Sequence, residues 1–142
     1  MSESATPVHG DELTGRCLCG AVRYRCGPPL SPPELCHCTS CRRASGAHAL
    51  GWISVKAEGL HYVGARPRVY ASSPGVERGF CGQCGTPLTY QQVARPGEID
   101  LTLGSVDQLD RVAPCDHIWM ADAPSWDRPM DSLPQHVRSR PP

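Results

Sequence analysis

Seven of the nine cysteines in this chain of 142 residues stand in three tight clusters, and their spacing constrains the fold more than any other feature. Such clusters are typical of zinc ligands, because a short turn can aim neighbouring thiolates at one point. Nine is an odd number, so a disulfide framework could not use every thiol. The clusters are a C-x-C pair (Cys17, Cys19), a C-x-C-x-x-C triple (Cys36, Cys38, Cys41) and a C-x-x-C pair (Cys81, Cys84).

The cysteine clusters can be divided between metals in two ways. The triple spans only six residues, so its three sulfurs most easily share one metal, and the two pairs then complete a four-sulfur site. Alternatively, Cys17 and Cys19 could join the triple, which would gather five sulfurs and leave Cys81 and Cys84 without partners. Spacing favours the first division because it keeps every local cluster whole.

The two sites of the first division differ in kind. Four protein sulfurs make a closed, structural zinc site, which can contribute on the order of 10 kcal/mol to folding. Three sulfurs leave a position for water or substrate, as in a catalytic zinc site. The alternative is a second site that is empty, oxidised or closed by another protein ligand. His37 lies between two ligands and should face away from them if the segment is extended.

The rest of the sequence predicts a mainly β fold. Glycine and proline, at 14 and 15 residues, disfavour long helices and favour short strands joined by turns. Val22, Tyr24 and Cys26 alternate with arginines, the pattern of a half-buried strand. The sequence predicts a flexible N-terminal arm over residues 1–12, one small domain over 13–127 and an irregular tail over 128–142. Further strands are expected near residues 50–55, 60–63, 68–71, 76–80, 87–91, 99–103 and 116–120.

Charge and hydropathy exclude several classes of protein. The 14 basic and 14 acidic residues cancel, and Lys56 is the single lysine, which argues against a nucleic-acid partner. No run approaches 18 apolar residues, so no membrane span is expected. The N-terminal segment lacks the pattern of a signal peptide, so we expect a cytoplasmic protein, in a compartment that disfavours disulfides.

Together, the cysteine motifs resemble those of a known family. The segments 15–24, 36–46 and 80–88, with the late residues Pro114, His117 to Trp119 and Trp126, are similar to the motifs of the glutathione-dependent formaldehyde-activating enzyme (GFA) family, also called the CENP-V/GFA domain. The resemblance covers roughly residues 13–127. It implies a small zinc-stabilised domain of the Mss4-like, β-tent type and two zinc ions per chain. Cys17, Cys19, Cys81 and Cys84 match the structural ligands, and Cys36, Cys38 and Cys41 match those of the second zinc.

The resemblance also implies carbon–sulfur chemistry, in which glutathione condenses with formaldehyde to S-hydroxymethylglutathione, written in reverse as a lyase reaction. The leading hypothesis is therefore a zinc-dependent lyase-like enzyme with a small thiol such as glutathione as its partner. One alternative is a non-catalytic, zinc-stabilised binding module, and another is redox sensing through Cys36–Cys41. No motif of the chain specifies the substrate or the oligomeric state.

Several residues outside the metal motifs are candidates for the second site. His117 could act there as a general acid or base or support a ligand, and its alternative is a packed core residue. His48 is a weaker candidate for the same part. Arg42 and Arg43 could offset thiolate charge or capture a substrate carboxylate, and their alternative is solvated surface charge. Cys26 is expected to be a buried, inert thiol, whereas Cys115 could approach the second metal.

Overall fold

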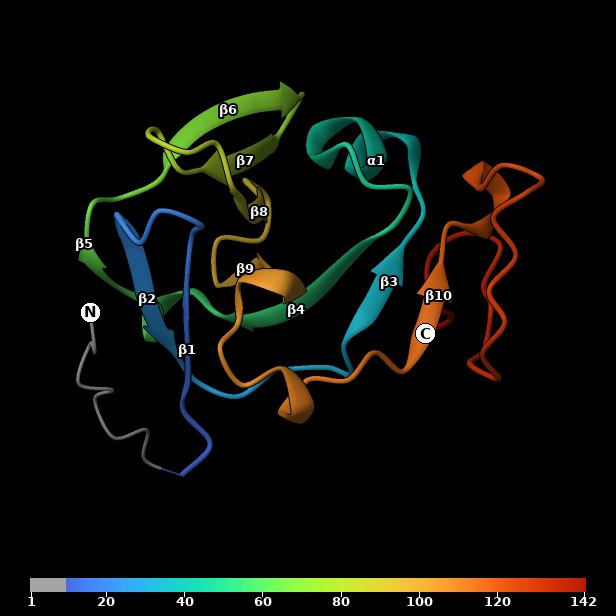
Figure 1. Cartoon of the computed structure of the whole chain (residues 1–142), viewed down its shortest axis with the longest axis horizontal. Helices are drawn as coiled ribbons and strands as arrows, with labels where there is room; N and C mark the ends of the chain where they lie inside the picture. The colour runs from blue at the N-terminus through green and yellow to red at the C-terminus, as the bar shows by residue number, and fades with distance from the viewer. Residues whose placement is uncertain (1–9) are drawn as a thin grey trace.

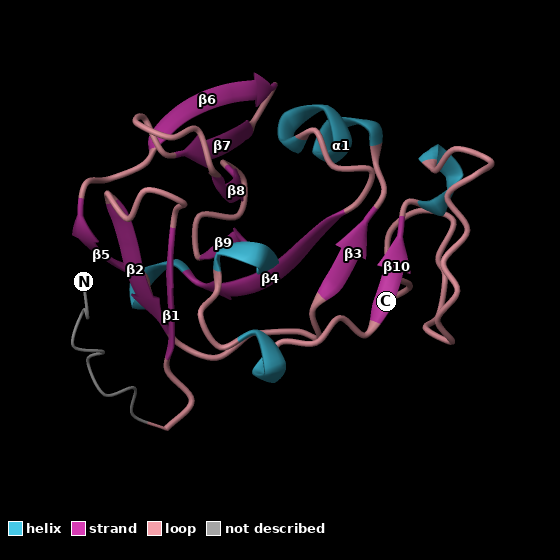
Figure 2. Ribbon diagram, in the orientation of Figure 1, coloured by secondary structure: helices cyan, strands magenta, loops and turns pink. Residues whose placement is uncertain are grey.

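The computed structural model describes residues 10–142, and in this part of the chain ten strands form two sheets (Figures 1 and 2). The smaller sheet has the order β1-β2-β5, with all neighbours antiparallel. Its strands are β1 (Leu13–Arg16), β2 (Val22–Cys26) and β5 (His61–Gly64). In β2 the predicted alternation is confirmed, because Val22, Tyr24 and Cys26 are buried while the two arginines are exposed.

The larger sheet has seven strands in the order β10-β3-β4-β9-β8-β7-β6. Only the β10–β3 pair is parallel, and the other pairs are antiparallel. The strands are β3 (Glu34–Cys36), β4 (Leu50–Lys56), β6 (Arg68–Ser73), β7 (Val76–Phe80), β8 (Pro87–Gln92), β9 (Glu98–Thr102) and β10 (Asp116–Ile118). The protein is thus mainly β and a small single domain, as predicted.

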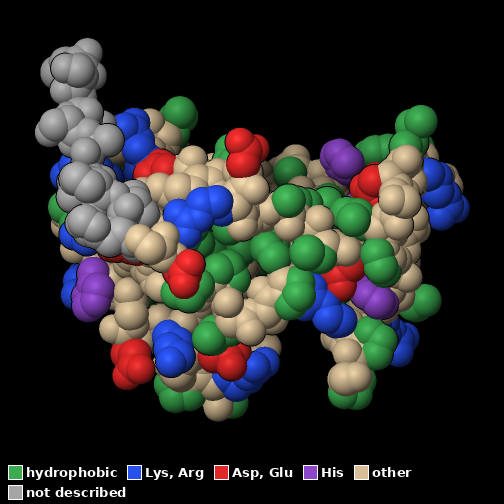
Figure 3. All heavy atoms as spheres, turned by 90° about the horizontal axis from the view of Figure 1, so that it is seen from below, with side chains coloured by type: hydrophobic (Ala, Val, Ile, Leu, Met, Phe, Trp, Pro, Cys, Tyr) green, Lys and Arg blue, Asp and Glu red, His purple; other side chains and the backbone are tan. Residues whose placement is uncertain are grey.

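Two hydrophobic clusters hold the sheets together. The main core lies between the small sheet and the middle of the large one, and includes Tyr24, Ile53 and Leu88 as well as the cysteines Cys17 and Cys81. A second, smaller cluster joins the ends of β3, β4 and β10 and consists of Cys36, Cys41, Trp52 and Ile118. Each group of clustered cysteines is therefore built into a core. Hydrophobic side chains also form a band across the face seen in Figure 3, with charges of both signs around it.

One short helix, α1 (Thr39–Ser45), was not expected from the sequence. Cys38 caps its N-terminus, since the Cys38 Sγ accepts a hydrogen bond from the Cys41 backbone N–H. Gly46 ends it with a φ of 77°, a left-handed conformation that glycine adopts without strain. The other helical segments are single 3-10 turns over Ala57–Gly59, Leu103–Ser105, Leu109–Arg111 and Met120–Asp122. None of the helices in the described residues is long and apolar enough to cross a membrane.

The tail after residue 127 contains no helix or strand but is bonded to β10, beside which Figure 1 shows it running. The backbone of His117 is bonded to Pro134 and His136, and Trp119 N–H donates to the carbonyl of Arg138. Arg140 forms an ion pair with the buried Asp116. Most of the predicted N-terminal arm lies outside the described residues. Of the part that is described, Asp11 is exposed and Glu12 is half-buried.

Candidate metal centres and the adjoining cavity

The structure brings Cys17, Cys19, Cys81 and Cys84 together, with their sulfurs all within 4.8 Å of one another. Cys17 and Cys19 follow β1, and the other pair stands in the turn between β7 and β8. The Sγ atoms of Cys17 and Cys19 lie 3.6 Å apart, and those of Cys19 and Cys81 lie 3.8 Å apart. These separations are far longer than a disulfide bond of about 2 Å and suit sulfurs that share one metal ion.

Backbone and hydroxyl donors point at the sulfurs of this four-cysteine group. Val22 N–H donates to Cys17 Sγ at 3.3 Å, and two amides of the 81–84 turn donate to Cys81 Sγ at 3.4 Å. Burial alone would raise the pKa of Cys17, but the hydrogen bond from Val22 and the neighbouring thiols leave that pKa lowered. The hydroxyl of Thr86 lowers the pKa of Cys84 to about 5. At Cys17 and Cys84 the surroundings therefore favour the thiolate, the form in which cysteine binds metals. At Cys19 a backbone hydrogen bond from Ala21 is outweighed by burial and the neighbouring thiols, which raise its pKa to about 11.

Glycines make both turns of the four-cysteine group possible. Gly20 follows Cys19 with a φ of 80°, and Gly85 follows Cys84 with a φ of 81°. Other residues rarely adopt this left-handed backbone, which lets each turn fold its two sulfurs to the same side.

Cys36, Cys38 and Cys41 form a second group of sulfurs within 4.8 Å of one another. Cys36 ends β3, Cys38 caps α1, and Cys41 lies in the first turn of that helix. Hydrogen bonds from Cys36 and Cys41 lower the pKa of Cys38 to about 2, and the same contacts raise the pKa of Cys36. Without a cation, one thiolate is stabilised at the expense of its neighbours. A divalent ion would remove that competition, so the donor set fits a thiophilic metal such as zinc.

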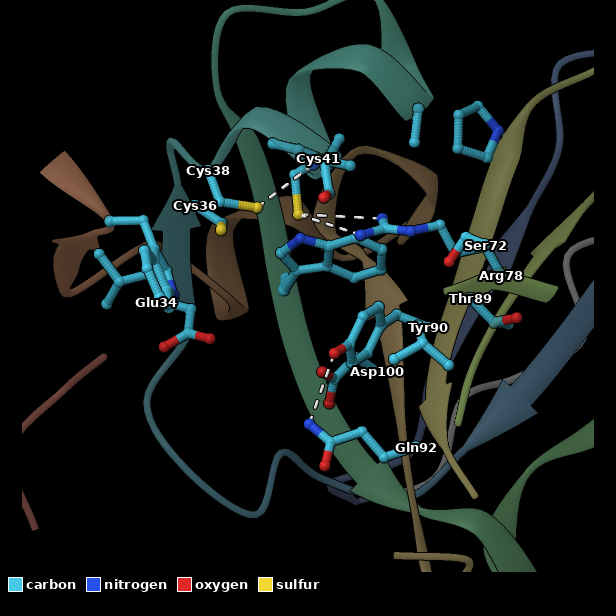
Figure 4. Close-up of a pocket in the computed structure, with 18 of the residues that line it drawn as sticks. Glu34, Cys36, Cys38, Cys41, Ser72, Arg78, Thr89, Tyr90, Gln92 and Asp100 are labelled. Atoms are coloured by element: carbon cyan, nitrogen blue, oxygen red, sulfur yellow. Dashed lines mark hydrogen bonds between the residues drawn. The ribbon is translucent and has the colours of Figure 1, made fainter. Parts of the chain in front are cut away.

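The second group opens into a cavity of about 1160 Å³, whose wall includes all three sulfur-bearing residues (Figure 4). Trp52 and Tyr90 form an apolar part of the wall, with ring centroids 5.9 Å apart in an edge-to-face contact. Glu34 and Asp100 line another part, and burial raises the pKa of both carboxyls. The three-sulfur group therefore lies where a small molecule can reach it.

Arg78 of β7 also lines the cavity, and sequence reasoning missed it. Its two Nη atoms lie 3.8 and 3.9 Å from Cys41 Sγ, and its guanidinium lies 5.0 Å from the centroid of the Tyr90 ring. Its Nε is buried and has no hydrogen-bond partner among the described residues. Because 37 residues separate Arg78 from Cys41 in the sequence, no local pattern could have shown this contact.

His117, the predicted acid or base, is not among the residues that line this cavity. Its neighbour Ile118 lines the wall, as does Cys36 in the paired strand β3. His117 precedes Ile118 on β10, and His37 follows Cys36 at the end of β3. Both histidines turn to the opposite side, where His117 Nδ1 lies 2.9 Å from Nε2 of His37. The other ring nitrogen of His117 lies 3.0 Å from the carboxylate of Asp131. Both ring nitrogens of His117 are therefore engaged away from the cavity.

His37 faces away from the sulfurs of its neighbours, as its place between two ligands predicted. Its Nδ1 lies 3.1 Å from Oδ2 of Asp127, and Nδ1 of His48 lies 3.0 Å from the same oxygen. These bonds, together with those of His117, form a chain that we call the histidine–aspartate chain. It consists of Asp127, His37, His117 and Asp131, with His48 as a branch. Hydrogen bonds from the histidines keep the pKa of Asp127 below its usual range despite burial.

The remaining candidates are placed as follows. Arg43 lines the cavity, whereas Arg42 does not and has one Nη 3.4 Å from the Thr39 hydroxyl. Cys115 is exposed and does not join either group of sulfurs. Cys26 is buried in the main core, and burial raises its pKa to about 11, which suits the inert thiol that was predicted.

The fold and the two cysteine centres thus define a class of protein: a small β domain that can hold two metal ions, one beside an open cavity. The particular family follows from comparison. The model of the glutathione-dependent formaldehyde-activating enzyme family matches residues 12–122, so the chain belongs to this family.

Two examples show what the chain is similar to. One, from Halomonas elongata, is named "Putative glutathione-dependent formaldehyde-activating enzyme" and is 31% identical over 125 residues, covering 80% of this chain and 78% of the relative. The other is a Rhodobacter sphaeroides protein of known crystal structure, with a TM-score of 0.56 and 26% identity. That match covers 67% of this chain and 88% of the other.

Proposed function

We propose that this protein is a zinc-dependent enzyme that makes and breaks the carbon–sulfur bond between a thiol and an aldehyde, with glutathione and formaldehyde as the substrate pair. The observation that carries the proposal is the three-sulfur group in the wall of a large cavity. Family membership and the name of the Halomonas elongata relative support the choice of substrates.

The two cysteine groups would have different tasks. Cys17, Cys19, Cys81 and Cys84 would hold a zinc ion with four thiolates, which closes its coordination and ties β1 to the β7–β8 turn. Cys36, Cys38 and Cys41 would hold a zinc ion with a free position. At that position the ion would keep a bound thiol in the nucleophilic thiolate form.

Residues of the cavity wall would bind and orient the substrates. Trp52 and Tyr90 offer apolar surface to the carbon chain of the thiol, and Arg43 offers a positive charge to one of its carboxylates. In place of direct catalysis, we assign His117 a positioning role, because its hydrogen bond holds His37 between two sulfur ligands. A reducing compartment such as the cytoplasm would keep the seven thiols available for metal.

NMR exchange spectroscopy with ¹³C-labelled formaldehyde and glutathione tests the proposal. The zinc-loaded protein should accelerate exchange between free formaldehyde and S-hydroxymethylglutathione well above the uncatalysed rate. Cys38→Ser should abolish the acceleration, and Cys115→Ser, a matched change at an exposed cysteine outside both groups, should retain it. Exchange at the background rate with fully loaded protein would reject the substrate assignment and favour the non-catalytic binding module.

A further inference from the structure

Arg78 is the charged side chain that reaches the three-sulfur group from across the cavity (Figure 4). It belongs to β7, whereas the sulfurs belong to β3 and to the start of α1. Among the described residues it forms no ion pair, although Arg95 and Arg140, also in the cavity wall, are paired with carboxylates. Its charge is therefore available to a ligand in the cavity.

The position of the Arg78 guanidinium is fixed by its neighbours. It lies over the ring of Tyr90, which in turn packs edge-to-face on Trp52. A cation over an aromatic face is held by the ring's electron density, and the planar guanidinium can then present its N–H groups edgewise. Arg78 is thus a preorganised donor beside the sulfurs, and both Nη atoms are within 4 Å of Cys41 Sγ.

This closeness limits which substrate atom Arg78 can contact. When a substrate sulfur joins the same group, the atoms within a few bonds of that sulfur are the ones held beside the Arg78 guanidinium. The carboxylates of a peptide thiol lie many bonds from its sulfur, so they fit poorly. The aldehyde oxygen fits well, because after addition it stands two bonds from the sulfur, in the unit S–C–O.

We propose that Arg78 is a catalytic residue that donates hydrogen bonds to the aldehyde oxygen while the carbon–sulfur bond forms. This inference rests on the proposed function and deepens it. The thiol first releases its proton to solvent. A sulfur lone pair then forms the bond to carbon, the π electrons of the carbonyl move to oxygen, and the oxygen takes a proton from solvent. Arg78 stabilises the negative charge on oxygen before that proton arrives, as oxyanion donors do.

A binding experiment tests Arg78 independently of turnover. Thioacetate and ethanethiol share a two-carbon chain and a sulfur, but only thioacetate carries an oxygen two bonds from that sulfur. Affinities of both for the zinc-loaded protein are measured by calorimetry. Arg78→Met should weaken thioacetate at least tenfold and ethanethiol less than twofold, with Arg78→Lys between the wild type and Arg78→Met. Arg128→Met, at an exposed arginine outside the cavity, should change neither affinity.

Kinetics supply the second readout. Removal of one oxyanion donor typically lowers kcat by about 10²–10³-fold, so Arg78→Met should show that loss with little change in KM for the thiol. If Arg78→Met with full zinc content weakens both ligands equally, or weakens neither, the role of Arg78 is overturned even if the wild type is active. If the preference for thioacetate over ethanethiol depends on Arg78 but the wild type does not catalyse formaldehyde exchange, the oxygen-binding role stands and the proposed substrates are rejected.

Discussion

His37 and His117 are joined by a hydrogen bond of 2.9 Å although 80 residues separate them in the sequence. His37 stands between two cysteines of the open metal centre, and His117 is the middle residue of β10. His37 is also hydrogen-bonded to Asp127, and His117 is hydrogen-bonded to Asp131. The histidine–aspartate chain therefore links the metal-ligand segment to the C-terminal part of the protein.

Replacement of His117 by alanine should destabilise the fold and loosen the second metal. The change leaves the buried His37 without a partner at Nε2 and creates a cavity, so the free energy of unfolding should fall by about 3 kcal/mol. Denaturant unfolding measures this loss, and zinc release to a chelator should accelerate for one ion of the two. The matched change His61→Ala, at an exposed histidine, should alter stability by less than about 0.5 kcal/mol. Unchanged zinc release in His117→Ala would contradict the positioning role.

The ion pair between Asp116 and Arg140 should make stability depend on pH in the acid range. Arg140 donates two hydrogen bonds to the buried Asp116 and keeps the pKa of this carboxyl below its usual range. The stabilisation is therefore complete above the unfolded-state pKa of about 4 and is lost as pH falls through the lower folded-state pKa. Asp116→Asn should cost about 2 kcal/mol at pH 7 and flatten the dependence of unfolding free energy on pH below about 4. An unaltered pH dependence in the variant would exclude this contribution.

The two metal centres should respond differently to loss of one ligand. Cys81 is buried in the main core, so Cys81→Ser should lose the closed metal site and much of the native fold, a change that circular dichroism and thermal unfolding detect. Cys38→Ser should keep the fold and lose only the second metal, because that residue lies at the edge of the smaller cluster. Metal analysis should give two zinc ions in the wild type and one in Cys38→Ser. Loss of both ions from Cys38→Ser would show that the centres are not independent.

Removal of the tail should also be costly. A chain that ends at residue 127 lacks Asp131 and Arg140, and it loses the backbone bonds from residues 134–138 to β10 and the turn that follows it. We expect a clear fall in the midpoint of thermal unfolding and faster amide exchange in β10. A chain that ends at residue 140 provides the control and should behave like the full chain. Equal stability of all three would support the predicted end of the domain at residue 127.

The sequence predicted the strands in which hydrophobic alternation is regular, and it missed the short elements whose formation depends on tertiary contacts. Alternation predicted β2 well because Val22, Tyr24 and Cys26 all face one core. The three-residue β3 follows a proline-rich segment and has too few residues to show a period. The helix α1 begins at Thr39 after the N-cap Cys38, a residue type that seldom caps helices, so the cap gave no ordinary start signal.

The candidate site shows the same division. Local spacing was enough to predict the three cysteine clusters, because each is completed within a few residues, and keeping each cluster whole favoured the division that the structure has. The contact between Arg78 and Cys41 could not be predicted, because it arises only in the folded protein, where both residues line the same cavity. The separation of His117 from the cavity was equally hidden, since it depends on the parallel pairing of β10 with β3.

A zinc-edge anomalous difference map from crystals of the zinc-loaded protein tests the central claim most directly. We expect two peaks per chain, one among Cys17, Cys19, Cys81 and Cys84 and one among Cys36, Cys38 and Cys41. The second ion should be completed by water or a small ligand facing the cavity. A single peak, or a second ion closed by a fourth protein side chain, would contradict an open catalytic centre.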